Sequence, residues 1–175
     1  NDEVCTWMLV DEGEGWLRPQ LALAHDLDFG IRSSCYGLFK NAREANETLR
    51  TLAQSHHLCD TLCGFEKTLP GKPCFGYQLK RCKGACIGNE PLAKHTMRLI
   101  TALTRLKLVA WPFAGPAIIR EGDDVHLIDA WRYLGTARSE SELHALGDHR
   151  PPPFDRDAYK LLAKYVSKMV PLAGL

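Results

Sequence analysis

Five of the seven cysteines lie within 28 consecutive positions, in a segment that is also rich in glycine and proline. Glycine and proline interrupt helices and strands, so residues 57–88 are expected to be mostly loop, with one helical turn near 77–83. Such a segment cannot carry much hydrophobic core of its own. Seven cysteines in 175 residues are too few for a disulfide scaffold. In a reducing compartment a cluster of this kind more often binds a metal than forms disulfides.

The spacing of these cysteines favours an iron–sulfur cluster over zinc. Cys74, Cys82 and Cys86 are separated by seven and three residues, and can converge if the loop folds back. The fourth thiolate is either Cys59 or Cys63. Zinc sites usually contain two pairs of closely spaced ligands, and among Cys74, Cys82 and Cys86 only the last two form such a pair. The alternatives are a structural zinc site and unmetallated thiols.

Charge is distributed unevenly along the chain, although the formal net charge is only +1. Residues 67–107 hold nine Lys and Arg against one acid, a net of +8, whereas residues 1–30 are strongly acidic. A basic block of this kind is typical of contact with nucleic-acid phosphates. The alternative is a protein-interaction module, in which the block docks onto the acidic segment or a partner protein. The residues expected to contact DNA are Lys72, Lys80, Arg81, Lys83, Lys94 and Arg98.

Hydrophobic periodicity and turn residues predict an α+β fold with two β-hairpins, about four helices and the Cys-rich loop between two of the helices. The expected hairpins and short strand are 5–24, 117–129 and 32–39. The expected helices are 42–56, 91–107, a short helix opened by Ser139, and a last helix from Asp155 to about Met169. Asn41 and Asn89 are the expected caps of the first two helices. The segments 1–35, 36–107 and 108–175 are expected to form one compact domain.

Several motifs resemble a known family of repair nucleases. Tyr36-Gly37-Leu38-Phe39 precedes a helix containing Glu47, Leu49 and Leu52, and the loop reads Pro73-Cys74-x-x-Tyr77-Gln78-x-x-Arg81-Cys82-x-Gly84-x-Cys86. Residues 35–88 thus resemble the region that follows the GIY-YIG nuclease domain in UvrC-type excinucleases and Cho-type endonucleases. The resemblance implies nucleotide-excision repair and a 4Fe-4S cluster held by Cys59, Cys74, Cys82 and Cys86. Ala85 departs from the family, which commonly has proline before the last cysteine.

Motifs in the last third are similar to the C-terminal end of proteins that join a DNA polymerase III epsilon-like exonuclease to a GIY-YIG domain. They are Trp111-Pro112-Phe113-x-Gly115-Pro116, Trp131-x-Tyr133-Leu134-Gly135-Thr136-Ala137 and Pro153-Phe154-Asp155. No segment reproduces the catalytic motifs of either nuclease. The chain is therefore expected to be the non-catalytic, DNA-binding part of a larger endonuclease or exonuclease, whose nuclease domain and other repair proteins would be its partners.

The chain contains no run of about 18 apolar residues, and its first residues are acidic. These features predict a cytoplasmic protein, and the resemblance to UvrC- and Cho-type nucleases implies a bacterial protein associated with the nucleoid.

Overall fold

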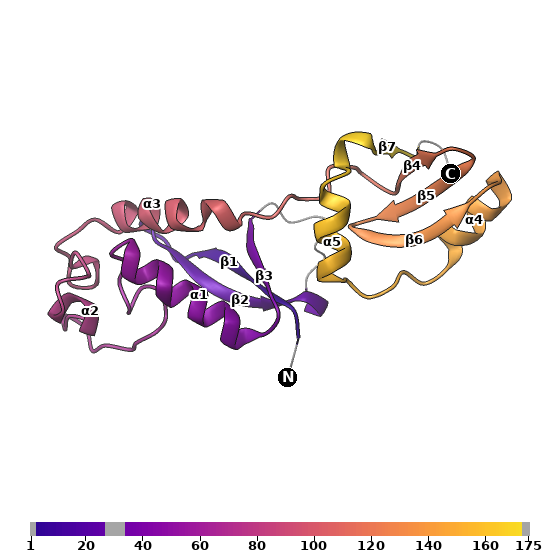
Figure 1. The fold of residues 1–175 in the computed structure, drawn as a ribbon. Helices are drawn as coiled ribbons and strands as arrows, with labels where there is room; N and C mark the ends of the chain where they lie inside the picture. Colours follow the sequence, from indigo (N-terminus) through magenta and orange to yellow (C-terminus); the bar gives the residue numbers. More distant parts are fainter. Residues whose placement is uncertain (1–2, 27–33, 173–175) are drawn as a thin grey trace. The chain divides into compact units, whose positions relative to one another are not determined.

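The computed structural model describes residues 3–26 and 34–172, and the chain divides into two compact units (Figure 1). The first unit contains the described residues up to Leu23 together with Ser34–Leu108. The second contains Val109 onward and the short 3-10 helix η1 (Ala24–Asp26). The described residues form five α-helices and two antiparallel sheets. The predicted α+β class is confirmed.

A three-stranded antiparallel sheet forms one side of the first unit, in the order β2-β1-β3. The predicted hairpin consists of β1 (Cys5–Asp11) and β2 (Leu17–Leu23), with Trp7 paired to Leu21. Strand β3 (Cys35–Phe39) pairs with the other edge of β1. The first residues of the expected strand 32–39 lie outside the described residues.

Helices α1 (Ala42–Ser55) and α3 (Leu92–Leu103) pack with this sheet around one hydrophobic core. The α1 N-cap is Asn41, as predicted, and its side chain accepts a hydrogen bond from the Glu44 amide at 3.0 Å. The Trp7 indole donates to the carbonyl of Ala45 at 3.0 Å and so fixes α1 against β1. The largest fully buried core side chains are Leu49, Leu58, Leu99 and Leu103.

The second cap prediction is wrong, because α3 begins after Pro91 and has no side-chain cap. The side chain of Asn89 instead donates to the Tyr77 hydroxyl at 3.3 Å, within the cysteine loop. The single helical turn of the loop, α2 (Phe75–Gln78), lies slightly before the predicted turn at 77–83. It starts there because the sulfur of Cys74 accepts a hydrogen bond from the Tyr77 amide.

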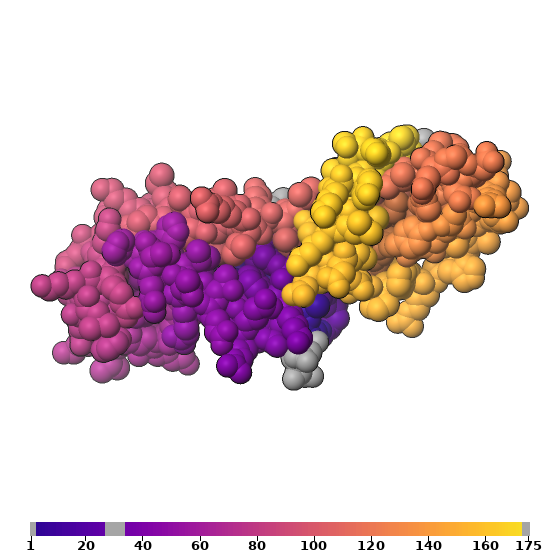
Figure 2. Space-filling view, in the orientation of Figure 1, coloured from indigo at the N-terminus to yellow at the C-terminus, as the bar shows by residue number. Residues whose placement is uncertain are grey.

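The cysteine loop forms one end of the first unit, beyond the ends of α1 and α3 (Figure 1). In the space-filling view, its rose-coloured side chains reach the surface on the face shown (Figure 2). The loop has its own small buried cluster, which includes Cys59, Leu62, Cys74 and Cys82. Because this cluster is made largely of thiols, the loop depends on sulfur chemistry more than on apolar packing.

The second unit is built on a four-stranded antiparallel sheet with the order β6-β5-β4-β7. Strands β4 (Ala117–Glu121) and β5 (Asp124–Asp129) form the predicted hairpin. Two further strands, β6 (Arg132–Ala137) and the two-residue β7 (Val170–Pro171), are not predicted from the sequence. Both strands contain residues that disfavour strands, glycine in β6 and proline in β7, which hides them from a propensity argument.

Two helices complete the second unit, and their caps agree with the prediction. Ser139 caps α4 (Glu140–Asp148), and Asp155 caps α5 (Arg156–Ala163). The last helix is shorter than expected, since a separate 3-10 helix, η4 (Val166–Lys168), follows it. The core is aromatic: the ring of Trp131 lies edge-to-face on Trp111 and Tyr159, each with centroids 5.1 Å apart.

Candidate metal centre

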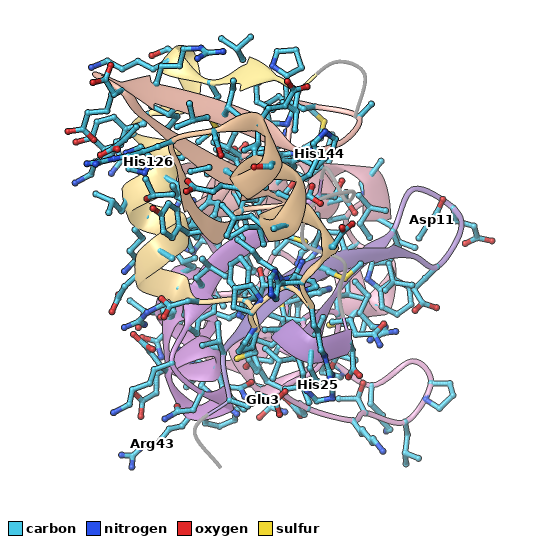
Figure 3. All side chains as sticks on the ribbon, turned by 90° about the vertical axis from the view of Figure 1, so that its right-hand side faces the viewer. Glu3, Asp11, His25, Arg43, His126 and His144 are labelled. Carbon is cyan, nitrogen blue, oxygen red and sulfur yellow. The ribbon has the colours of Figure 1, made fainter. Side chains whose placement is uncertain are left out.

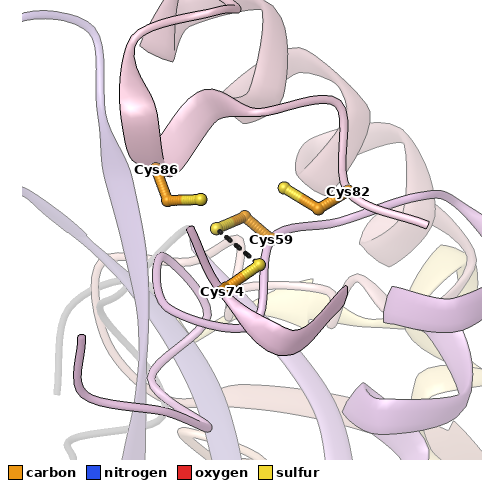
Figure 4. Close-up of side chains that lie close together, drawn as sticks. All are labelled: Cys59, Cys74, Cys82 and Cys86. Carbon is orange, nitrogen blue, oxygen red and sulfur yellow. Dashed lines mark hydrogen bonds between the residues drawn. The ribbon is translucent and has the colours of Figure 1, made fainter. Parts of the chain in front are cut away.

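Four cysteine side chains point toward one another at the end of the first unit (Figure 4). Their sulfur atoms all lie within 4.8 Å of one another, and the Cys59 and Cys74 sulfurs are 3.9 Å apart. The four belong to different parts of the loop. Cys59 follows α1, Cys74 caps α2, Cys82 follows α2, and Cys86 lies in the 3-10 helix η2 (Ala85–Ile87). Cys86 is half-buried and the other three are buried.

Backbone hydrogen bonds and two glycines fold the loop so that the sulfurs meet. The Gly76 carbonyl accepts from the amides of Arg81 at 2.8 Å and Cys82 at 3.1 Å, which closes the chain after α2. Gly84 has a φ of +86°. A Cβ there would lie 2.7 Å from the Cβ of Asn89, so only glycine fits. The glycines at these positions allow the tight return that brings Cys82 toward Cys74.

Two backbone amide groups point at cysteine sulfurs, and the one at Cys82 favours its thiolate form. The Tyr77 amide donates to the Cys74 sulfur at 3.4 Å, and the Gly84 amide donates to the Cys82 sulfur at 3.3 Å. The Cys59 thiol, as a hydrogen-bond donor, lowers the pKa of Cys82 to about 5. The same bond and burial raise the pKa of Cys59. Cys59 thus keeps its proton beside a thiolate at Cys82, and burial also raises the pKa of Cys86. A metal that bound all four sulfurs as thiolates would displace the protons of Cys59 and Cys86.

The structure favours Cys59 over Cys63 as the fourth member of the group. Cys63 is buried in the main hydrophobic core of the unit and is absent from the group of converging sulfurs. Burial raises its pKa to about 12, so this thiol stays neutral. Among the described residues, the four converging cysteines are the only group of His, Cys, Asp and Glu side chains close enough to hold a metal ion.

A buried histidine positions the backbone at the first of these cysteines. The Nε2 atom of His95, on α3, accepts a hydrogen bond from the Cys59 amide at 3.0 Å. His95 is fully buried, and burial, followed by the charge of Arg98, lowers its pKa to about 4. The ring is therefore neutral at pH 7. The sequence places His95 on the buried stripe of a helix, but its contact with Cys59 cannot be read from periodicity.

The Glu90–Arg98 pair ties the two sides of the loop together. Both Nη atoms of Arg98 donate to the Glu90 carboxylate, at 2.5 and 2.8 Å. The Arg98 side chain also donates to the carbonyls of His56 and His57. Arg98 holds the pKa of Glu90 below its usual range. Arg98 thus joins the end of α1 to the beginning of α3 instead of projecting into solvent.

The other residues expected to contact DNA lie on or near the cysteine loop. Lys72, Lys80, Lys83 and Lys94 are exposed, whereas Arg81 is half-buried beside Cys82. Within the described chain, none of the five forms an ion pair. Apart from Arg98, the predicted cations are therefore available to an external anion.

The second unit contains a cavity of about 610 Å³ between its sheet and α5. Its walls are mostly apolar. At its edge, the Nδ1 atom of His126 lies 3.0 Å from the Tyr133 hydroxyl and its Nε2 atom lies 2.9 Å from the Glu121 carboxylate (Figure 3). No local sequence pattern predicts this cavity, because its walls come from a β-hairpin and a helix that are distant in the sequence.

Every helix in the described part of the chain is too short or too polar to span a lipid bilayer.

Comparison with known proteins identifies the class and then the family. Residues 5–105 match the family model for the UvrC/Cho excinuclease middle domain, and residues 116–175 match that for the Excinuclease Cho C-terminal domain. These two matches place the chain among the excinucleases of DNA repair. The chain belongs to the UvrC/Cho family, as a C-terminal region of the Cho type.

Curated relatives support the same assignment. The chain is 35% identical over 168 residues to Excinuclease cho of Salmonella typhi and 36% identical to that of Escherichia coli strain K12. Each alignment covers 94% of this chain and 55% of the relative, so the chain spans about half the length of these proteins. No solved structure matches it.

Proposed function

We propose that this chain is the DNA-binding accessory region of a repair excinuclease, in which a cysteine-ligated 4Fe-4S cluster orders the basic loop. A GIY-YIG nuclease domain of the same parent protein would cut the DNA, in the cytoplasm of a bacterium and on the nucleoid. The observation that carries the metal centre is the convergence of four cysteine sulfurs within 4.8 Å, three of them inside the segment 67–107 that holds the excess of positive charge. The choice of iron rests on the likeness to UvrC-type proteins.

The residues of the loop have separate tasks in this proposal. Cys59, Cys74, Cys82 and Cys86 would hold the metal. A bound cluster supplies four metal–thiolate bonds that cross-link the loop. The amides of Tyr77 and Gly84 stabilise the thiolate charge, and His95 fixes the backbone of Cys59. The loop thus becomes a rigid support for its lysines.

Four exposed lysines and the half-buried Arg81 would bind the phosphate backbone without reading base sequence. Lys72, Lys80, Arg81, Lys83 and Lys94 carry this role, whereas Arg98 contributes by holding the loop to the helices. Phosphate contacts release counterions, so affinity should fall steeply as salt is raised and depend little on sequence. Binding that is insensitive to salt would contradict this part of the proposal.

Zinc is the second candidate for the centre, and the distance between two of the sulfur atoms favours it. Thiolates bound at about 2.3 Å to a tetrahedral zinc ion lie about 3.8 Å apart. The Cys59–Cys74 separation of 3.9 Å matches this value. The irregular ligand spacing along the chain and the likeness to UvrC-type proteins favour iron.

Metal analysis of protein purified without oxygen tests the centre. The wild type is compared with Cys82→Ala and with Cys63→Ala, which removes a buried thiol outside the group. We expect a brown protein that absorbs near ~400 nm and contains iron and sulfide. Cys82→Ala should lose the iron, and Cys63→Ala should keep it. Stoichiometric zinc in a colourless protein would replace the iron assignment, and a folded metal-free protein would overturn both.

Charge reversal tests the DNA-binding role against a protein-interaction role. The double change Lys80→Glu and Lys83→Glu alters two exposed residues of the loop, and the matched control Lys160→Glu and Lys164→Glu alters two exposed residues near the end of α5. We expect the loop variant to lose DNA binding while metal content and unfolding temperature stay unchanged. Loss of a protein partner with unchanged DNA binding would favour the interaction module.

A further inference from the structure

A second, smaller cavity lies in the first unit, beside the cysteine loop, and has a volume of about 230 Å³. A water molecule occupies about 30 Å³ in the liquid, so the cavity has room for a group several times larger. It is lined by α1 and by three parts of the loop. The lining residues are Arg50, Gln54, Asp60, Phe65, Phe75 and Arg81.

Two arginines give this cavity a positive character. The guanidinium of Arg50 lies 4.4 Å from the ring centre of Phe65, a cation–π contact that holds it in place. The Nε atom of Arg81 is buried and has no hydrogen-bond partner among the described residues. A buried donor without a partner is unfavourable, and an anion in the cavity would supply the missing acceptor.

The one acid of the cavity does not neutralise these arginines. An oxygen of Asp60 accepts the Gly76 amide at 3.1 Å, which commits the carboxylate to the backbone of α2. In the described part of the chain, Asp60 forms no ion pair with Arg50 or Arg81. The cavity therefore keeps an excess of one positive charge and an unmet donor, which suits a phosphate group.

An exposed aromatic ring borders the same cavity. Phe75, the first residue of α2, is 55% exposed. Large apolar rings that stay exposed at the edge of a cationic site are typical of surfaces on which unpaired bases stack. We propose that this cavity binds one unpaired nucleotide of a DNA strand, with its phosphate on Arg50 and Arg81 and its base on Phe75. This inference rests on the proposed DNA-binding function and assigns it a specific site.

The cavity is coupled to the metal centre through the chain itself. Asp60 directly follows Cys59, Phe75 directly follows Cys74, and Arg81 directly precedes Cys82. Three of the six lining residues are thus bonded to three of the four converging cysteines. Metal ligation fixes the backbone at these points, so the metal-loaded protein should bind the nucleotide more tightly than the metal-free protein.

Fluorescence anisotropy with short single strands tests the site in the metal-loaded protein. The probes are labelled pentathymidylate and a strand of the same length that lacks all bases. The variants are Arg50→Ala and Phe75→Ala. Their controls are Arg43→Ala, on the same helix with its side chain directed into solvent (Figure 3), and Leu79→Ala, exposed directly after α2 and outside the cavity.

We expect Arg50→Ala and Phe75→Ala each to weaken pentathymidylate binding about tenfold, and both controls to change it less than about twofold. The wild type should prefer the probe with bases, and Phe75→Ala should lose this preference. Arg50→Ala should weaken both probes alike, because it acts on phosphate. Metal-free wild type should bind pentathymidylate more weakly than the loaded protein.

Failure of this inference is distinguishable from failure of the proposed function. If each variant equals its control while the Lys80→Glu, Lys83→Glu protein loses DNA binding, the cavity is not the nucleotide site and the function stands. If wild-type protein with its metal binds neither single-stranded nor duplex DNA at low salt, both proposals are overturned.

Discussion

Glu90 and Arg98 connect the two chain segments that border the cysteine loop. The two side chains form an ion pair with two hydrogen bonds, and Glu90 is only 9% exposed. Arg98 also donates to the carbonyls of His56 and His57. Removing one partner of a buried ion pair strongly destabilises a protein, because the remaining charge is left buried without its partner. At the residue scale, the position of the loop therefore depends on one carboxylate outside the cysteine group.

Glu90→Gln should lower the free energy of unfolding by about 2–3 kcal/mol at pH 7, the usual worth of hydrogen bonds to a buried charge. Arg98 lowers the pKa of Glu90 in the folded state, so the unfolded state binds a proton more readily. The stabilisation is then present above the unfolded pKa and is lost as the pH falls through the lower folded pKa. Urea unfolding at pH 7 and below pH 4.5 should show the gap between wild type and variant closing.

The control for this prediction is Glu47→Gln, which breaks an exposed pair with Arg43 on α1. It should cost only about 0.3–0.5 kcal/mol. Equal losses for the two variants at pH 7 would show that the Glu90 pair has no special role.

Gly84→Ala should destabilise the loop and hasten loss of the metal. The control is Gly88→Ala, because both glycines have φ near +80° but only Gly84 lacks room for a Cβ. Each change carries the left-handed backbone cost of about 1–2 kcal/mol. The clash with Asn89 adds to it only at Gly84, so Gly84→Ala should release metal to a chelator several-fold faster than Gly88→Ala. Equal rates would mean that Asn89 moves aside.

Elements with local signals could be predicted from the sequence, and elements that depend on distant contacts could not. Asn41 followed by Glu44, and Ser139 followed by Glu142, mark helix starts that the structure confirms. The short turn α2 was placed too late, because its cap is a cysteine sulfur. The sequence does not predict strand β6, because this strand is defined by its pairing with β5 and not by a pattern in its own residues.

Ser139→Ala should weaken α4 by about 1 kcal/mol, because the hydroxyl caps the amide of Glu142 at 3.2 Å. Hydrogen exchange measured by mass spectrometry should show about fivefold faster exchange in the first turn of α4, with α1 unchanged. His144→Ala, exposed on the same helix, is the control, because Ser141 itself hydrogen-bonds to the Ser139 hydroxyl. Equal exchange in the two variants would argue against the cap.

At the scale of the whole chain, the candidate site could be predicted better than its surroundings. The four cysteines were named from spacing and family likeness, and the structure brings the same four together. The cavity beside them and the support from His95 arise from contacts between segments far apart in sequence, which no local pattern encodes. The grouping of β1 and β2 with the cysteine loop in one compact unit likewise depends on contacts between segments far apart in sequence.

Removal of the metal should affect the two units differently, because all four cysteines belong to the first. Calorimetry before and after chelation should show a lower unfolding temperature for the first unit and an unchanged one for the second. Hydrogen exchange at Trp7 and Trp131 would assign the transitions. The same experiment tests whether the segments 1–35, 36–107 and 108–175 form one compact domain, which stays a prediction. A single transition that shifts as a whole would support the one-domain expectation.

The four sulfurs are unequally buried, so reagents in solution can reach the group of cysteines from one side only. Three thiols are sealed behind protein, and only Cys86 is partly open to solvent. If the proposed metal is bound, oxygen, peroxide and chelators would reach it first at Cys86, and we expect its lifetime in air to be set there.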